Sequence, residues 1–313
     1  MNNTVRSALV LCFSTAVALT GCRATDDIDA TQLTIVTTDA SLDHAVALAV
    51  GEYLADQDID VAFEQHHEPD DVFATLEAEA DTAPDHARIG VVTAHQDPTL
   101  DENPLRVPDS LEILSQAPAE LGLVPATSTV TAARFGLHQD DDAEQPVAPA
   151  CDQQTWLHAH TPEHEIATTT AALADQGCQP AFEAAALTDS EAYVALAHQL
   201  TTQQDTVALV YGIDPMIPDR GLTTLDVNTD QWPHSNVIAV AAPALEDPLT
   251  EDIVAVLEVL DSEAATDLLR GYHNAQVSSS DLAYDVDHAM RYWLAAYGLV
   301  DQDTVTNVST END

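Results

Sequence analysis

Two aromatic residues stand where expected strands give way to loops, and their surroundings suggest a site for a small cation. Tyr211 opens the segment YGIDP, which contains Asp214, and Trp232 lies in QWPHSN. A quaternary ammonium cannot donate hydrogen bonds, so proteins bind it through cation–π attraction to ring faces. A carboxylate next to such a ring, as Asp214 is here, would add an opposite charge. The alternative is that Asp214 only begins an Asp-Pro turn.

Other residues that could carry chemistry give weaker signals. The histidines of WLHAHTPEH, at positions 158, 160 and 164, could supply two zinc ligands from a strand face and a third from the next helix. With 13 histidines in the chain, clustering by chance is easy, and a surface role is favoured. The mature sequence lacks the patterns that mark common catalytic sites. These are the patterns for a nucleophilic serine, a phosphate loop, a dinucleotide site and an HExxH zinc site. We therefore expect neither an enzyme nor a cofactor, and we keep an extracellular hydrolase as a minor alternative.

The remaining aromatic residues of the same half of the chain are expected to lie mostly in the core. This group consists of Phe135, Trp156, Phe182 and Tyr193. Only 5% of all residues are aromatic, and because each ring buries a large apolar surface, most of them are expected in the core.

The charge balance excludes a class of partners. The 313 residues include 54 Asp and Glu, 8 Arg and no Lys, for a formal charge of −46. The arginines are scattered, whereas nucleic-acid binding needs clustered cations. Apolar residues make up 45% of the chain, which is enough for a folded core. The sequence therefore predicts a folded protein that binds no nucleic acid and whose acidic surface keeps it hydrated outside the cell or at high salt.

The first residues have the pattern of an export signal. Arg6 precedes an apolar run over Ala8–Thr20, which is too short for a comfortable membrane span. The run ends in LTGC, which resembles a bacterial lipobox whose cysteine, here Cys22, is acylated. We therefore expect a signal peptide over 1–21, a polar tether over 22–32, and a lipid-anchored domain on the extracytoplasmic face of the membrane. An ordinary signal peptide with an incidental cysteine is the alternative.

Two cysteines remain once Cys12 is removed with the signal and Cys22 is acylated. An even pair in an oxidising compartment favours a disulfide, here between Cys151 and Cys178. Closing a loop of this length would stabilise the fold by roughly 3 kcal/mol on the chain-entropy model. A metal site or two free thiols would be the alternatives.

Strand and helix patterns alternate along the mature chain and predict an α/β fold. The first group of expected elements consists of a strand at 33–38, a helix over 41–54, a strand at 59–64, a helix over 70–80 and a strand at 88–93. The helix over 41–54 has apolar residues at i, i+3, i+4, i+7 and i+8, and Asp39 or Ser41 is the candidate N-cap. This order is typical of a parallel sheet covered by helices.

A second group of elements follows the acidic, proline-bearing segment 139–149. Expected strands lie at 155–158, 182–186 and 206–211, with helices over 163–176 and 189–200, and then a strand at 236–241 and helices at 250–260, 262–272 and 280–297. Gly298 is placed to end the last helix. The pattern thus predicts two α/β units and a helical tail.

Taken together, these segments resemble the substrate-binding lipoproteins of glycine betaine/choline (osmoprotectant) ABC transporters. The resemblance depends on the lipobox with LTIVTTDASLDHAVALAVGEYLADQDIDV, the cysteine pair around CDQQTWLHAHTPEHE, the segment DTVALVYGIDPMIPDRGLTTLDVNTDQWPHSNVIAVAAPAL, and the final helix ending in Gly-Leu. Each motif is weak alone, whereas their order and spacing cover essentially the whole mature chain.

The resemblance implies a type II periplasmic-binding-protein fold with two α/β lobes, two crossovers and a ligand cleft between the lobes. Lobe one would comprise 31–127 plus 237–313, and lobe two 128–236. The partners would be an ABC permease and a small cationic or zwitterionic solute such as betaine, choline or carnitine.

The implied ligand set divides by chemistry. Asp39 and Asp214 would oppose the cation, and Tyr211 and Trp232 would cover it. Thr37, Ser128 and Asn236 would donate hydrogen bonds to a solute carboxylate.

Two loops depart from the family pattern. The first loop is TTDASL, over 37–42, and the loop after the third strand is VTAHQD, over 92–97, without an aromatic residue. The ligand could therefore differ from betaine, or second-lobe rings could suffice. The alternative function is that of a degenerate binding-protein homologue, acting as a sensor or interaction protein, in which the usual aromatic box is lost.

Overall fold

A computed structural model describes most of the mature chain. It covers residues 32–80, 87–96, 107–135, 151, 153–158, 163–184, 190–203, 205–225, 234–243, 247–277 and 285–302. The expected signal segment, the tether up to residue 31 and Cys22 lie outside these residues. Within the described ranges, every helix is too short or too polar to cross a lipid bilayer.

The described strands form one sheet path, in which β10 pairs with β5 only at Gly122 and Leu121. We use the names lobe one and lobe two for the elements on either side of this short pairing. Lobe one contains β1 (Gln32–Thr38), α1 (Ser41–Ala55), β2 (Asp60–His66), α2 (Pro69–Ala80), β3 (Ala87–Gln96), β4 (Glu112–Gln116), β10 (His234–Ala241), α8 (Asp247–Glu258), α9 (Ser262–Val277) and α10 (Val286–Ala296). Its strands run in the order β2-β1-β3-β10, and β4 also pairs with β10. The pairs of β1 with β2 and β3 are parallel, as the sequence predicts, whereas β10 is antiparallel to β3.

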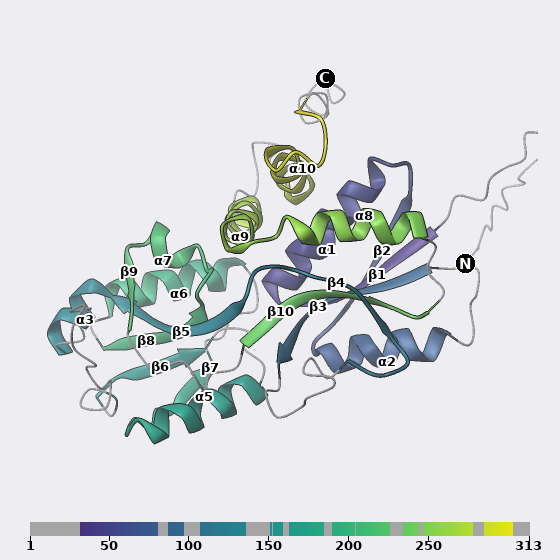
Figure 1. Cartoon of the computed structure of the whole chain (residues 1–313). Coiled ribbons are helices and arrows are strands. Elements are labelled where there is room, and N and C mark those ends of the chain that lie inside the picture. The colour runs from purple at the N-terminus through teal and green to yellow at the C-terminus, as the bar shows by residue number, and fades with distance from the viewer. Residues whose placement is uncertain are drawn as a thin grey trace, which may run out of the picture. The chain divides into compact units, whose positions relative to one another are not determined.

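Alternating side chains place the lobe-one sheet between two apolar layers. Leu33 and Ile35 of β1 point into a large cluster with α1, α8, α9 and α10, whereas Val36 packs with α2 on the other face. The same alternation separates Val237 from Ile238 in β10, because successive strand side chains point to opposite faces. Figure 1 shows α2 on one side of this sheet and α1 and α8 on the other.

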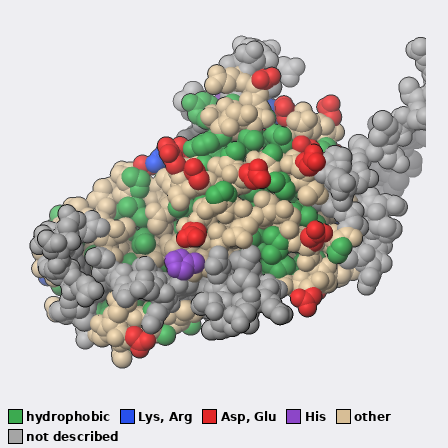
Figure 2. Space-filling model, in the orientation of Figure 1, with side chains coloured by type: hydrophobic (Ala, Val, Ile, Leu, Met, Phe, Trp, Pro, Cys, Tyr) green, Lys and Arg blue, Asp and Glu red, His purple; other side chains and the backbone are tan. Residues whose placement is uncertain are grey.

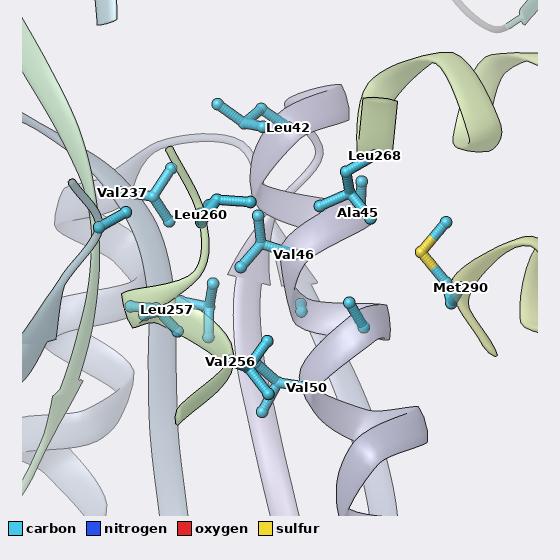
Figure 3. Packing of buried hydrophobic residues seen from close by; sticks show 14 of the residues in the cluster. Leu42, Ala45, Val46, Val50, Val237, Val256, Leu257, Leu260, Leu268 and Met290 are labelled. Carbon is cyan, nitrogen blue, oxygen red and sulfur yellow. The ribbon is translucent and has the colours of Figure 1, made fainter. Parts of the chain in front are cut away.

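Helix α1 is central to the larger of these two layers. Val46 and Val50 lie against Val256 and Leu257 of α8, and Leu268 and Met290 approach from α9 and α10 (Figure 3). Each of these side chains is at most 1% exposed, because every face of α1 except its polar edge is covered. The apolar spacing seen in the sequence therefore predicts the packing of this helix correctly.

Lobe two has a smaller sheet. Its elements are β5 (Leu121–Ser128), α3 (Thr129–Phe135), β6 (Thr155–His158), α5 (Glu163–Asp175), β7 (Phe182–Ala184), α6 (Ser190–Thr202), β8 (Thr206–Tyr211), α7 (Met216–Asp219) and β9 (Leu222–Thr224). The strands run β5-β8-β6-β7, with β9 paired to β5. The pairs of β6 with β7 and β8 are parallel, whereas β5 is antiparallel to β8.

The disulfide expected in this lobe is confirmed. Cys151 and Cys178 are bonded, with their Cα atoms 5.4 Å apart, and both are buried in a cluster with Trp156. Trp156 meets the ring of Phe182 edge to face at 5.7 Å. The disulfide therefore joins the residues before β6 to the loop that follows α5, and these two aromatic residues belong to the core.

The structure contains five elements that the sequence patterns do not predict. They are the strands β4, β5 and β9 and the short helices α3 and α7. β5 contains Pro125, which lacks an N–H and lowers the strand signal, yet its carbonyl accepts a hydrogen bond from Leu225 N at 2.8 Å. Because β5 pairs with β8 from Leu123 onward, we count the whole strand in lobe two, although Leu121 and Gly122 pair with β10. The lobe boundaries implied by the resemblance stay a prediction.

Two helix ends test the capping predictions. Gly298 has φ of 75°, as expected for the residue that ends α10. The prediction of Asp39 or Ser41 as N-cap of α1 is wrong, because the N-cap is Ala40, which makes no side-chain cap bond. The hydroxyl of Thr38 instead accepts a hydrogen bond from Ala40 N at 3.2 Å. Asp39 does not cap because its carboxylate lies 2.6 Å from His67 Nδ1.

Candidate functional site

The carboxyl ends of β1 and β3 carry a buried carboxylate. Asp43, in the first turn of α1, is 1% exposed and accepts hydrogen bonds from the hydroxyls of Thr38 and Thr93, both at 2.5 Å. Burial raises the pKa of Asp43, and the two hydroxyls oppose this shift. Since Thr38 ends β1 and Thr93 lies in β3, Asp43 ties the start of α1 to two neighbouring strands.

The carboxyl end of β8 carries a second carboxylate. Oδ1 of Asp214 accepts hydrogen bonds from Tyr193 Oη and from Met216 N, each at 2.8 Å. The bond from Met216 fixes the turn that leads into α7, so the turn-forming role of Asp214 is present. Burial raises the pKa of Asp214. Burial, followed by the nearby charge of Asp214, also raises the pKa of Tyr193.

Helix α9 lies between these two carboxylates. The ring of His273 stacks on that of Tyr193, with centroids 3.7 Å apart and planes 11° from parallel. The preceding residue, Tyr272, has its hydroxyl 2.8 Å from His44 Nδ1 in α1. Burial lowers the pKa of His44. A chain of contacts therefore runs from the start of α1 through α9 to the residues around Asp214.

Thr37 and Asp39 lie together at the end of β1, as the sequence predicts. The Thr37 side chain is fully buried and donates its hydroxyl to Val91 O at 2.8 Å. This bond joins β1 to β3 and occupies the hydroxyl proton that a solute carboxylate would need. Asp39 is exposed, next to His67. Of the two, only Asp39 has a side chain that reaches solvent.

Ser128 lies far from the rest of the expected ligand set. In the register of β5 and β8, Tyr211 faces Leu123, five residues before Ser128, which corresponds to about 17 Å along the strand. The Ser128 hydroxyl accepts a hydrogen bond from Thr131 N at 3.1 Å and so caps α3. The structure does not bring Ser128 together with Tyr211 and Asp214, because β5 runs antiparallel to β8.

Of the two expected ligand residues near β10, the structure describes Asn236 but not Trp232. Asn236 is 2% exposed in β10, and its amide donates to Ala117 O at 3.4 Å and to Ala119 O at 3.1 Å. These bonds fasten the chain between β4 and β5 to β10. Trp232 lies outside the described residues. Tyr211 is half-buried and packs against the cores of both lobes.

Sequence reasoning missed four residues of this region: Asp43, Tyr193, Tyr272 and His273. The sequence predicts Tyr193 mostly in the core, and Asp43 is one acid among 54. The pattern of the helix containing Tyr272 and His273 indicates only a helical tail. The helical spacing of polar residues along this helix is the one signal that could have pointed to contacts with lobe two.

The clustered histidines and a surface pocket are two further places where a ligand could bind. Among the described side chains, no group of three or more His, Cys, Asp or Glu is arranged to hold a metal ion. Of the three clustered histidines, His160 lies outside the described residues, as does the side chain of His164. A pocket of about 250 Å³ lies at the other end of α1, where Glu52 pairs with Arg291 at 2.5 Å.

The chain was compared with known proteins. No family model matches it, and no curated protein matches it in sequence. Solved structures do match. Lactococcal OpuAC, in its closed-liganded conformation with glycine betaine, is 12% identical, with a TM-score of 0.59 over 88% of this chain and 98% of that chain. An ABC-transporter choline-binding protein in complex with choline is 15% identical, with a TM-score of 0.56 over 84% and 88%. Apo YehZ from Escherichia coli is 14% identical, with a TM-score of 0.53 over 87% and 100%.

These matches define the class of fold. The two lobes, joined by chain crossings before β5 and before β10 and by the pairing of these two strands, form the type II periplasmic-binding-protein fold that the family resemblance implies. Of the solved proteins named above, the choline-binding protein is that of an ABC transporter.

Proposed function

We propose that this chain is the extracytoplasmic solute-binding protein of an ABC importer, and that its solute is a small quaternary ammonium compound such as glycine betaine, choline or carnitine. The observation that carries the proposal is the structural match to two binding proteins solved with glycine betaine and with choline. Each match covers at least 84% of this chain and nearly all of the other, so it involves both lobes.

The charge and chemistry of the strand ends support a cationic solute. Asp39 lies at the end of β1, and Asp214 follows β8 together with the half-buried ring of Tyr211. Ligands of open α/β sheets bind outside the carboxyl ends of the strands. A ring face next to a carboxylate suits a quaternary ammonium. In this proposal Trp232 supplies a second ring.

The acidic surface favours the same choice of solute. Figure 2 shows acidic side chains spread over the visible face, with very little blue from arginine. A formal charge of −46 raises the local concentration of cations and disfavours anions, within a screening length of about 8 Å at physiological ionic strength. The proposal therefore predicts that anionic solutes bind more weakly than cationic or zwitterionic ones.

The location and partners in this proposal follow from the sequence signals. Cys22 would be acylated and would hold the protein at the outer face of the membrane, where an ABC permease receives the solute. Replacing Cys22 with Ala should move the protein from the detergent phase to the aqueous phase in a phase-separation assay. Unchanged partitioning would contradict the anchor and leave the solute proposal intact.

The solute proposal is tested by titration calorimetry at pH 8. Choline, glycine betaine and carnitine are titrated into the wild-type protein, and 3,3-dimethylbutan-1-ol serves as the uncharged isostere of choline. We expect binding of at least one ammonium compound and none of the isostere, because the isostere lacks the charge that the rings and carboxylates recognise.

Variants assign the residues. Asp214→Asn and Trp232→Ala should each weaken binding about tenfold or more, consistent with roughly 1–2 kcal/mol for a desolvated cation contact. Asp205→Asn is the matched control, because Asp205 lies at the opposite end of β8 and pairs with Arg134 at 2.6 Å. Binding that survives both site variants unchanged would remove these residues from the site. No binding by the wild type to any of the three compounds would favour the degenerate homologue.

A further inference from the structure

One side of α9 contacts lobe two at three positions that are one helical turn apart. Thr266, Arg270 and His273 have the spacing i, i+4 and i+7, which places them in one stripe. Thr266 Oγ1 donates to Ile213 O at 2.9 Å, Arg270 Nε lies 3.0 Å from Asp219 Oδ2, and His273 stacks on Tyr193. Three different kinds of interaction therefore recur along a single face.

The other side of α9 belongs to the core of lobe one. Ala265, Leu268 and Leu269 are at most 5% exposed and pack in the cluster that surrounds α1. Tyr272 contacts His44 from the same helix. The helix is therefore fixed to lobe one while its polar stripe faces lobe two, and it cannot follow lobe two without leaving this core.

The segment that the stripe contacts is the one after β8. Ile213, which is 7% exposed, belongs to the lobe-one cluster although it follows a lobe-two strand. Asp219 ends α7, and Tyr193 donates to Asp214. The stripe thus contacts this loop directly at Ile213 and Asp219. It also contacts Tyr193, which donates a hydrogen bond to Asp214.

We propose that α9 is a clamp that fixes the loop Tyr211–Asp219 onto lobe one, with Thr266, Arg270 and His273 as its positioning residues. The clamp connects the lobes at a place separate from the two chain crossings and from the pairing of β10 with β5. It holds Tyr211 and Asp214 at a set position relative to the end of β1. The effect on solute affinity rests on the proposed function, whereas the effect on the loop does not.

The test measures amide hydrogen exchange in the solute-free protein. In the Arg270→Ala/His273→Ala double variant, we expect exchange over residues 211–220 to accelerate about tenfold, because a stacked pair and an ion pair are lost together. Arg134→Ala is the matched control, since the Arg134–Asp205 pair lies within lobe two. The single variant His273→Phe should exchange like the wild type, because phenylalanine preserves the stack.

Helix α2 distinguishes a local effect from a general loss of stability. It packs on the far face of the lobe-one sheet and should exchange at the wild-type rate in every variant. Unchanged exchange over 211–220, or an equal acceleration in α2, would overturn the clamp. Choline titrated into the double variant should bind about tenfold more weakly than to the wild type. If the wild type binds no choline, the proposed function fails while the exchange data still decide the clamp.

Discussion

The two lobes stabilise their cores by different means. Among the described residues, lobe one has a cluster of 33 buried side chains, to which lobe two contributes Leu121 and Ile213, and a second cluster of 10. Lobe two has two clusters of nine each, and it also has the disulfide. Small cores bury too little apolar surface to be stable without support, and cross-links supply it. Lobe two is therefore the lobe whose stability depends on few interactions.

The largest expected effect is the removal of the main side chain of a lobe-two core. Trp156 is fully buried and donates Nε1–H to Cys151 O at 3.4 Å. We expect Trp156→Ala to lower the free energy of unfolding by about 3–5 kcal/mol. Because the loss is confined to one small core, lobe two should unfold first. Urea titrations followed by circular dichroism and by Trp293 fluorescence, in a Trp232→Phe background, should give two separate transitions.

Trp293 provides the comparison in lobe one. It is 4% exposed and donates to Ala264 O at 3.0 Å. Trp293→Ala should also destabilise, but in a single transition, because its cluster includes four helices and the sheet. A single transition for Trp156→Ala as well would show that the two lobes unfold together.

The second effect is the loss of the disulfide. The Cys151→Ser/Cys178→Ser variant should lose roughly 3 kcal/mol, the loop-closure contribution for a 27-residue separation. Trp156 fluorescence should change at a lower urea concentration than in the wild type, while Trp293 fluorescence should keep its midpoint. Equal shifts of both midpoints would contradict a local role for the cross-link.

The third effect is overpacking in lobe one. A Cβ at Gly90 in β3 would lie 2.9 Å from both Leu76 Cδ1 and Val240 Cγ2. We expect Gly90→Ala to cost about 1–3 kcal/mol, measured by urea unfolding. Gly122→Ala is the control, because a Cβ there meets no atom within 4 Å. If Gly90→Ala left the free energy of unfolding unchanged, the side chains around Gly90 would have to move more easily than their close packing indicates.

The smallest effect depends on pH and compares the two buried carboxylates, Asp43 and Asp214. Burial raises both pKa values in the folded state, so near those pKa values the folded protein binds more protons than the unfolded chain. Stability is therefore lost as pH rises through the folded pKa. We expect the free energy of unfolding to fall as pH rises above 3.8, the ordinary pKa of an aspartate side chain. Asp43→Asn should reduce that slope by at most about 1.4 kcal/mol per pH unit, and a steeper slope in the variant would contradict this account.

The sequence predicted the fold where a pattern is local. The stripe of α1, the strands 155–158 and 206–211 and the glycine after α10 all depend on neighbours within a few turns. β5 was not predicted, because its proline weakens the local signal and its partners β8 and β9 lie about 80 to 100 residues away.

In the candidate site, too, local sequence patterns do not reveal contacts between residues that are distant in the sequence. Tyr211 and Asp214 could be chosen because they follow a recognisable strand. Ser128 enters the expected ligand set through the family resemblance, and no local pattern shows that β5 runs antiparallel to β8, so its distance from Tyr211 could not be inferred. The stack of His273 on Tyr193 joins residues 80 positions apart, and periodicity within either helix does not reveal it.

The position of β10 determines the order in which the lobes can form. Lobe two is built from one continuous stretch, Leu121 to Leu225, so its strands can pair soon after that stretch has been synthesised. The sheet of lobe one has β10 between β3 and β4, and α1 is covered by helices made more than 200 residues later. Such distant contacts form slowly, and the apolar face of α1 stays uncovered until they do. The more extensive core is thus the last to close, and the nascent chain must keep that helix from aggregating in the meantime.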